Sequence, residues 1–335
     1  MNAINEPQHK DYLARVARTA LSRWDIDADA ELRLISLSEN AMFLVTHGPL
    51  KWVLRVHRLG YHSANGVRSE LAWMQALRAE AGVETPLAVP GLDGALVQHV
   101  CAAPFPEPRM VVLFDFIAGV QPEPDNLHDA FDQLGAITAR MHQHSRHWQR
   151  PAFFERQVWD YEGAFGAKPI WGQWRAGFAR HLPGLELIER ADALMRQRLQ
   201  RYGKGHGRFG LIHTDFRLAN LLVAGGEAKV LDFDDCGFGW FLYDVASSTT
   251  FIENHADIGS IVAAWVDGYR KVADLDAENI AEIPTLMMFR RLIILGWAGS
   301  HPGTDLAREM GDAYSAETVE LAEKYLCGQL LGACQ

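Results

Sequence analysis

Four oxygen-bearing side chains lie close together in one stretch of the sequence, Gly210–Asp235. Asp215 is followed by Asn220, and Asp232 and Asp234 come after a short apolar stretch. Carboxylates gathered in this way repel one another unless a cation is present, and Mg²⁺ prefers oxygen ligands of this kind. A carboxylate that does not bind metal is available to orient a hydroxyl and accept its proton. The combination is typical of phosphoryl transfer, which depends mostly on positioning and charge neutralisation.

The local pattern around these residues predicts a β-hairpin. Two short apolar stretches flank the turn residues Ala224–Glu227, and the centre of the turn falls between Gly225 and Gly226. That centre places Asn220 opposite Leu231. Asp232 then lies at the same open end of the hairpin as Asn220, which gathers the amide and the carboxylates at one place.

The rest of the chain divides into a β-rich first part and a helical second part. The first part shows an amphipathic helix, then strand-like stretches of roughly period two around a second helix. After Pro122 the apolar residues recur mostly at helical spacing. We therefore expect a small β-rich lobe followed by a larger helical lobe. The expected elements are a helix from Tyr12 to Trp24, three short antiparallel strands between Leu32 and His57, a helix from Ser69, strands at Ala95–Val100 and Met110–Phe116, a helix from Leu127, a helix over 186–202, and several helices beyond Asp257.

The stretch His213-Thr-Asp215-x4-Asn220, followed by Asp232-Phe-Asp234, resembles the HxDxxxxN and DxD motifs of the aminoglycoside phosphotransferase and choline kinase family. That family is a branch of the protein-kinase-like fold. The resemblance implies an α+β, two-lobed fold with the active site in the cleft, and a kinase that uses ATP and Mg²⁺. It implies that Asp215 is the catalytic base, that Asn220 and Asp232 bind Mg²⁺ with Asp234 assisting, and that His213 supports the loop.

The resemblance also assigns the lobes. It implies a nucleotide-binding lobe over residues 1–113, a hinge over 114–119, and a catalytic and substrate-binding lobe over 120–335. Trp52–His57 resembles the strand that carries the nucleotide-contacting lysine, with arginine in its place here, and an arginine fork does not reproduce lysine geometry. The loop before Ala41 lacks the GxGxxG of protein kinases. The residues expected at the nucleotide are Arg55 with its helix partner Glu70, Ser38 and Asn40 in the loop, and Phe114 and Phe116 in the hinge stretch.

Other chemistry-bearing residues have both a functional and a structural interpretation. Asp244 resembles a bracing aspartate of the family. Arg217 either meets an acidic group or phosphate of the substrate or forms a salt bridge within the lobe. Cys236 lacks a base at a motif spacing and is interpreted as a packing residue. Three tryptophans either form an aromatic wall for a cationic substrate or pack in the ordinary way. Three histidines on a predicted helix are interpreted as packing or surface residues, because positions two apart point to nearly opposite faces and cannot converge on a metal. These sets are Trp159, Trp171 and Trp174, and His142, His144 and His147.

Composition excludes several classes of protein. The chain has 335 residues, of which 48% are hydrophobic and 22% are charged, and a net charge of −10. An acidic chain is a poor non-specific partner for nucleic acid or anionic lipid. Four scattered cysteines indicate neither a disulfide framework nor a CxxC metal site. We find no signal peptide and no apolar run long enough to span a membrane, so the sequence predicts a cytoplasmic protein.

These observations predict a kinase that phosphorylates a hydroxyl of a small molecule. The acidic site favours an amine-bearing alcohol: an amino alcohol, a hydroxy amino acid or an aminoglycoside-like acceptor. Two alternatives stay open, a Ser/Thr protein kinase of the bacterial stress-response type and a non-catalytic nucleotide-binding scaffold. The residues expected to shape the acceptor pocket are Glu253, Asp257, Arg290, Arg291, Trp297 and His301.

Overall fold

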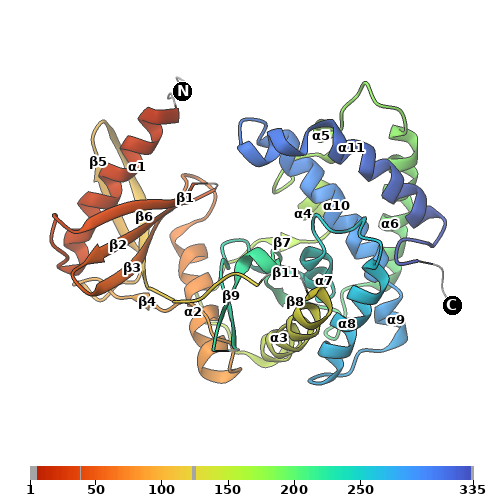
Figure 1. The fold of residues 1–335 in the computed structure, drawn as a ribbon, viewed down its shortest axis with the longest axis horizontal. Helices are drawn as coiled ribbons and strands as arrows, with labels where there is room; N and C mark the ends of the chain where they lie inside the picture. The colour runs from red at the N-terminus through yellow and green to blue at the C-terminus, as the bar shows by residue number, and fades with distance from the viewer. Residues whose placement is uncertain (1–5, 38, 123–125, 226, 333–335) are drawn as a thin grey trace. The chain divides into compact units, whose positions relative to one another are not determined.

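The structure is a computed structural model that describes residues 6–37, 39–122, 126–225 and 227–332 (Figure 1). The chain divides into two compact units. The first takes the chain up to Arg78 together with Glu84–Gly119 and Arg150–Glu155. The second takes Ala79–Val83, Val120–Gln149 and the chain from Arg156 onward. Among the described residues, no helix is long and apolar enough to cross a membrane.

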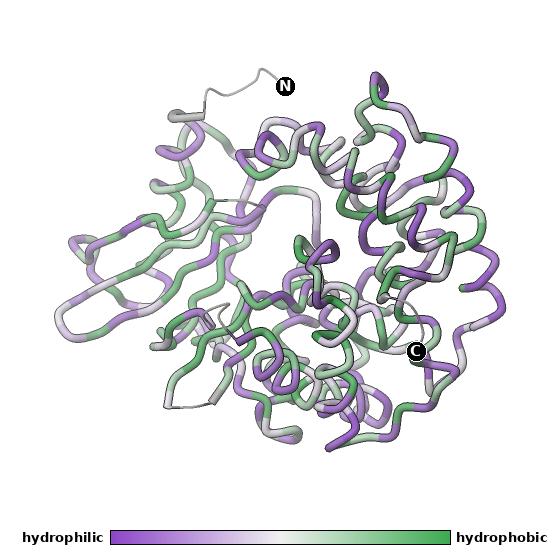
Figure 2. The backbone as a smooth tube through the Cα atoms, turned by 45° about the vertical axis from the view of Figure 1, so that its right-hand side comes forward, coloured by the Kyte–Doolittle hydropathy of each residue, from purple (hydrophilic) through white to green (hydrophobic). Residues whose placement is uncertain are grey.

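The first unit is built on an antiparallel sheet with the strand order β1-β2-β3-β6-β4, in which β5 also pairs with β6. Buried and less buried residues alternate along β2, as expected where one face of a strand packs on the core. Figure 2 shows that hydrophobic and hydrophilic residues both occur along the backbone of this unit. The three strands expected between Leu32 and His57 are confirmed. The strands are β1 (Glu31–Leu37), β2 (Ala41–His47), β3 (Leu50–Val56), β4 (Ala88–Val89), β5 (Gln98–Ala102) and β6 (Phe105–Asp115).

Two helices accompany this sheet. The helix α1 (Glu6–Ala20), continued by the 3-10 turn η1 (Leu21–Trp24), shares one hydrophobic core with the strands. The second helix, α2 (Ala64–Glu80), begins five residues before the predicted start at Ser69. The earlier start has a local cause: the Ser63 hydroxyl accepts a hydrogen bond from the Gly66 N–H at 2.9 Å and so caps the helix.

The second unit is mainly helical and holds two small sheets, one of order β7-β11-β8 and one of order β10-β9. Within it, α10 is buried on nearly all sides from Ile283 to Trp297, so it forms the centre around which other helices pack. Its helices are α3 (Leu127–His147), α4 (Tyr161–Phe165), α5 (Trp174–Gly177), α6 (Leu185–Tyr202), α7 (Tyr243–Ser248), α8 (Ile258–Arg270), α9 (Ala277–Ile280), α10 (Ile283–Ser300) and α11 (Asp305–Leu326). Its strands are β7 (Val158–Trp159), β8 (Phe209–Ile212), β9 (Leu221–Ala224), β10 (Glu227–Val230) and β11 (Gly237–Trp240), with the 3-10 turn η3 (Leu218–Asn220) before β9.

The helices α3 and α8 approach closely through two glycines. A Cβ atom at Gly135 would lie 2.0 Å from the Trp265 carbonyl oxygen, and one at Gly268 would lie 1.9 Å from the Asp132 carbonyl oxygen. Gly268→Ala is therefore expected to lower the free energy of unfolding by about 1–3 kcal/mol, because the two backbones must separate. Gly205→Ala is the control, since nothing lies within 4 Å of a Cβ there. Urea unfolding of both variants measures the difference; equal stability would contradict the close packing.

Candidate active site

The loop after β8 carries Asp215, and a buried carboxylate fixes its backbone. The N–H groups of His213 and Thr214 donate to the two oxygens of Asp244, at 3.1 and 2.8 Å. Thr214 has a φ of 72°, a left-handed conformation that is strained for a β-branched residue. The two hydrogen bonds to Asp244 stabilise this turn. Asp244 therefore braces the loop, as the sequence predicted.

The same carboxylate binds a histidine from α3. The Nε2 atom of His142 lies 3.0 Å from an oxygen of Asp244, and both side chains are fully buried. Burial lowers the pKa of His142, although Asp244 opposes the shift. Of the three helix histidines, His142 is thus a packing residue with a specific bracing role. The pattern of alternate histidines contained no signal for this partner 102 residues away.

Asp215 is surrounded by hydrogen-bond donors. Its Oδ1 atom lies 2.5 Å from the guanidinium of Arg290 and 3.1 Å from Nε of Arg217, and its Oδ2 atom accepts from Nδ2 of Asn220 at 3.0 Å. Burial alone would raise the pKa of Asp215, but the charges of Arg217 and Arg290 outweigh it and hold the pKa well below its usual range. Asp215 is therefore ionised at neutral pH. Its lone pairs are largely occupied by the protein itself.

Arg290 is the residue of this group whose contact the sequence did not reveal. It is 2% exposed and, besides Asp215, donates to the Thr214 carbonyl at 3.2 Å, the Tyr243 hydroxyl at 3.2 Å and the Thr250 hydroxyl at 3.0 Å. A sequence signal did exist, because two arginines interrupt an apolar helix and buried arginines need partners. The sequence placed Arg290 in the acceptor pocket, but it could not name Asp215 as its partner.

The predicted hairpin is confirmed in register. Strands β9 and β10 pair antiparallel around the predicted turn, and the Leu231 N–H donates to the Asn220 carbonyl at 2.8 Å. Asp232 follows directly, is exposed, and has a φ of 59°. Asp234 is buried. The structure thus brings Asn220 against Asp215 and places Asp232 beside the residue that pairs with Asn220.

The donor chemistry of this region fits a hard divalent cation. The amide nitrogen of Asn220 points at Asp215, donating to its carbonyl at 2.8 Å as well as to its carboxylate, so the amide oxygen lies on the opposite side of the group. Asp232 and Asp234 follow the end of β10 in the sequence, at the end of the hairpin that holds Asn220. Oxygen ligands of these two types suit Mg²⁺ and Ca²⁺. The residues present therefore fit the predicted metal.

The three candidate tryptophans and Cys236 of the second unit are packing residues. Trp159 and Trp174 are fully buried, and the Trp174 indole N–H donates to Asp192 at 3.2 Å. Trp171 is also buried and contacts the ring of Trp159 edge to face. Cys236 is buried as expected. Ordinary packing therefore accounts for the tryptophans better than an open aromatic wall does.

In the first unit, Arg55 and Glu70 form the predicted strand-to-helix pair. Two parallel hydrogen bonds of 2.8 and 2.7 Å join the guanidinium to the carboxylate, and both side chains are buried. The guanidinium also lies over the ring of Phe114, 5.1 Å from its centroid. Such a fork-to-carboxylate pair uses the geometry that distinguishes arginine from lysine. The structure thus brings three of the predicted nucleotide residues together.

The other predicted nucleotide residues lie elsewhere in this unit. Asn40 is buried, and its side-chain oxygen accepts from the Arg58 N–H at 3.1 Å. Phe116 is exposed after the end of β6, with the ammonium of Lys51 5.6 Å from its ring centroid. Ser38 lies outside the described residues. Neither Asn40 nor Phe116 is joined to the Arg55 pair by these contacts.

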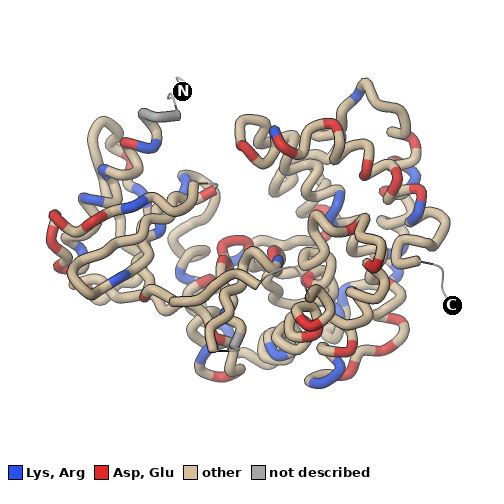
Figure 3. The backbone as a smooth tube through the Cα atoms, in the orientation of Figure 1, with Lys and Arg blue, Asp and Glu red and all other residues tan. Residues whose placement is uncertain are grey.

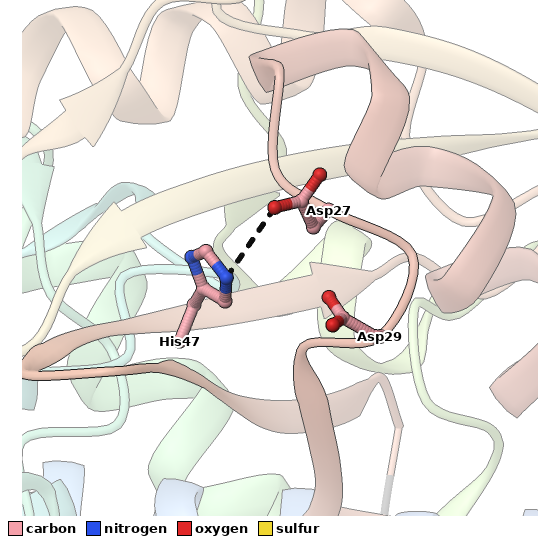
Figure 4. A group of neighbouring side chains, drawn as sticks. All are labelled: Asp27, Asp29 and His47. Carbon is pink, nitrogen blue, oxygen red and sulfur yellow. Dashed lines mark ion pairs between the residues drawn. The ribbon is translucent and has the colours of Figure 1, made fainter.

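Within the described ranges, three acidic or histidine side chains have ligand atoms close enough together to hold a metal ion: Asp27, Asp29 and His47 (Figure 4). The group lies in the first unit, and His47 forms an ion pair with Asp27 at 3.4 Å. All three residues are at least partly exposed. Exposed carboxylates commonly lie together without a metal, so this group carries no functional assignment.

Comparison with known proteins assigns the chain to a family. The profile of the phosphotransferase enzyme family matches residues 8–278, which is well over half of the chain. The chain belongs to this family.

One relative and two solved structures resemble this chain over most of its length. A structure of a microcompartment-associated aminopropanol kinase is 41% identical, with a TM-score of 0.87, and the match covers 95% of this chain and 99% of that one. The amicoumacin kinase of Bacillus subtilis (strain 168) is 22% identical over 86% of this chain and 87% of its own length. A structure of the amicoumacin kinase hAmiN, in complex with AMP-PNP, Ca²⁺ and Ami, has 21% identity and a TM-score of 0.77 over 98% of each chain.

These matches settle the general class of the protein. The fold is protein-kinase-like, with an antiparallel β-sheet region followed by a helical region, as predicted. The protein is a kinase, and family membership makes it a small-molecule kinase.

Lys and Arg are interspersed with Asp and Glu over both units (Figure 3).

Proposed function

We propose that this kinase uses ATP and Mg²⁺ to phosphorylate the hydroxyl of a small amino alcohol. The observation that carries the proposal is the 41% identity, over 95% of the chain, to a structure described as an aminopropanol kinase. Aminopropanol is an amino alcohol, the first acceptor class that the acidic site favoured. The hAmiN complex with AMP-PNP and Ca²⁺ supports a nucleoside triphosphate and a divalent metal for this fold.

Asp215 is proposed as the base that orients the acceptor hydroxyl and takes its proton. Its depressed pKa keeps the carboxylate ionised and therefore able to accept a hydrogen bond from the hydroxyl. Because the carboxylate is already surrounded by donors, one protein partner must give way to the acceptor. Arg217 is suited to do so, since its side chain is 29% exposed whereas that of Arg290 is buried. The displaced Arg217 is then available to a phosphate oxygen.

Asn220, Asp232 and Asp234 are proposed as the residues that hold the metal. The amide oxygen of Asn220 and the carboxylates supply the hard ligands that Mg²⁺ requires. When bound, Mg²⁺ neutralises negative charge on the phosphates of the nucleotide. Asp232 is exposed and is proposed as the main carboxylate ligand. Asp234 is buried and is proposed to assist in binding the metal or the substrate.

The first unit is proposed to bind the nucleotide. Arg55, held by Glu70, offers its guanidinium to phosphate, and Phe114 with Phe116 lies where the chain leaves β6. Ser38 and Asn40 remain the proposed loop residues near the phosphates. A fork fixed by two hydrogen bonds is pre-organised, so arginine can serve in the place of the usual lysine.

Asp232→Ala is expected to abolish the Mg²⁺-dependent part of ATP binding, because it removes the exposed carboxylate of the proposed metal site. The measurement is the rise in melting temperature caused by ATP, with and without Mg²⁺. Asp129→Ala, which removes an exposed carboxylate on α3, is the control and should keep the full Mg²⁺ effect. An unchanged Mg²⁺ effect in Asp232→Ala would remove this residue from the metal site.

The proposed function is tested by ADP release from ATP and Mg²⁺ against a panel of acceptors. The panel holds 1-amino-2-propanol, ethanolamine, choline, homoserine, serine, hydroxylysine, several aminoglycosides and a generic protein substrate. We expect the amino alcohols to give the highest kcat/KM. Preference for the protein would favour the protein-kinase alternative, and ATP binding without any acceptor-dependent turnover would favour the scaffold.

A second acceptor class is supported by one observation. Amicoumacin kinase of Bacillus subtilis matches 86% of the chain, although at only 22% identity. Amicoumacin therefore belongs in the acceptor panel, where a kcat/KM above that of the small amino alcohols would reverse the preference.

A further inference from the structure

Thr214 lies directly before the proposed base, and each of its polar groups is bound by another part of the second unit. Its N–H donates to Asp244 at 2.8 Å, and its carbonyl oxygen accepts from Arg290 at 3.2 Å. Its hydroxyl donates to the backbone carbonyl of Asp235 at 2.9 Å, and the residue is only 1% exposed. The hydroxyl therefore joins the loop of Asp215 to the segment that follows the hairpin.

The segment that accepts this hydrogen bond includes the proposed metal residue Asp234. Its three consecutive carbonyl oxygens, those of residues 234 to 236, accept hydrogen bonds from buried side chains. Arg156 donates to the first and the third carbonyl, and the indole N–H of Trp159 donates to the second at 2.9 Å. The Thr214 hydroxyl shares the second carbonyl. Among these three side chains, that of Thr214 is the one next to the base in the sequence, so it couples the two loops directly.

Each of the two loops contains a strained residue. Thr214 has a φ of 72° and Asp232 has a φ of 59°, left-handed conformations that residues other than glycine seldom adopt. Such strain persists only where the surrounding contacts hold it, and it gathers at functional sites. A β-branched residue is costly in this conformation, whereas glycine adopts it freely. The threonine at this position is therefore explained by what its hydroxyl binds, and not by the backbone.

We propose that Thr214 is a positioning residue whose hydroxyl holds the loop of the base against the segment of the metal residues. This inference rests on the proposed function, because it assumes that Asp215 and Asp232 act in one reaction. Phosphoryl transfer depends on placing the acceptor hydroxyl against the phosphate that the metal neutralises. Ligands that are already ordered also bind a metal more tightly than ligands that must first be ordered. Loss of this hydrogen bond should therefore weaken Mg²⁺ binding and slow turnover together.

The test titrates Mg²⁺ at a fixed ATP concentration and follows the melting temperature of the protein. Thr214→Val keeps the shape and branching of the side chain and removes its hydroxyl. The variant is expected to raise the Mg²⁺ concentration that gives half of the effect by about threefold to tenfold. It should also lower kcat with 1-amino-2-propanol by about tenfold to hundredfold and leave the KM of the acceptor within about twofold. Thr214→Ser keeps the hydroxyl and should resemble the wild type in all three quantities.

Thr85→Val is the matched control. Thr85 is a fully buried threonine of the first unit, and its hydroxyl donates to the Met74 carbonyl at 2.8 Å. Both valine variants thus lose a buried hydrogen bond from a hydroxyl to a carbonyl, so both should melt at a lower temperature than the wild type in the absence of ligands. Thr85→Val should keep the wild-type Mg²⁺ dependence and kcat. A loss of stability alone would affect both variants equally, whereas a positioning role affects only Thr214→Val.

An unchanged Mg²⁺ dependence in Thr214→Val, or an equal change in Thr85→Val, overturns the inference. The same conclusion follows if Thr214→Ser is as impaired as Thr214→Val. A shifted Mg²⁺ dependence in Thr214→Val, when the wild type phosphorylates no acceptor, supports the positioning role and contradicts the proposed function instead. If Thr214→Val does not fold, Thr214→Gly replaces it, because glycine adopts this φ without strain and also removes the hydroxyl. Thr214→Gly should need more Mg²⁺ than the wild type, and a wild-type Mg²⁺ dependence would again overturn the inference.

Discussion

Asp215→Asn is expected to lower the turnover of the amino alcohol by about 10²- to 10⁴-fold and to leave ATP affinity nearly unchanged. The variant keeps the size of the side chain and a hydrogen-bond acceptor for Arg290, but it loses the negative charge that would take the hydroxyl proton. The measurement is single-turnover phosphorylation, with ATP affinity taken from titration in the absence of acceptor.

The control for this prediction is Asp132→Asn. Asp132 is a carboxylate of the same unit that pairs with a cation, Lys271, at 2.6 Å near the surface. Its replacement should leave turnover within twofold of wild type. Wild-type turnover in Asp215→Asn would remove Asp215 from the chemistry, whereas a loss of ATP binding as well would mean that the substitution disturbs the fold.

Arg290→Met is expected to lower the free energy of unfolding by about 3 kcal/mol at neutral pH and to reduce kcat. Breaking this buried ion pair removes one of the two arginines that pair with Asp215 and leaves Arg217, while burial continues to disfavour the anion. The pKa of Asp215 should therefore rise. In a plot of kcat/KM against pH, the acidic limb of the variant should move to higher pH than that of the wild type.

The sign of the pH dependence follows from the depressed pKa of Asp215 in the folded wild type. Its contribution to stability is present above the ordinary carboxyl pKa of about 4 and is lost as the pH falls toward the folded value. The stability difference between wild type and Arg290→Met should thus shrink below about pH 4. Arg198→Met, which breaks a partly exposed pair with Glu282, should cost only about 0.5 kcal/mol. An unchanged acidic limb in Arg290→Met would show that Arg290 does not control Asp215.

The sequence predicted what depends on short-range patterns. The turn residues set the hairpin register, and the register alone put Asp232 next to the partner of Asn220. Strand alternation and helical spacing predicted the β-rich first part and the helical second part. The motif spacing led to Asp215, whose roles as base and neighbour of the metal residues stay predictions. Both the fold class and the motif could therefore be predicted from the sequence alone.

The contacts that tune the site could not be predicted, because they join residues far apart in sequence. Arg290 is 75 residues from Asp215, and His142 is 102 residues from Asp244. A pattern shows that a buried arginine needs a partner, but packing of the whole unit selects which one. The start of α2 was misplaced for a smaller reason, since the Ser63 cap lies outside the apolar periodicity.

This kinase is proposed to transfer a phosphoryl group from ATP to the hydroxyl of an amino alcohol. Phosphorus NMR of a reaction containing the protein, Mg²⁺, ATP and 1-amino-2-propanol tests it most directly. We expect a phosphomonoester signal that grows in equal amount with ADP and is absent when Asp215→Asn replaces the wild type. ATP consumption that yields only inorganic phosphate, or a phosphomonoester signal of wild-type size from Asp215→Asn, would contradict it.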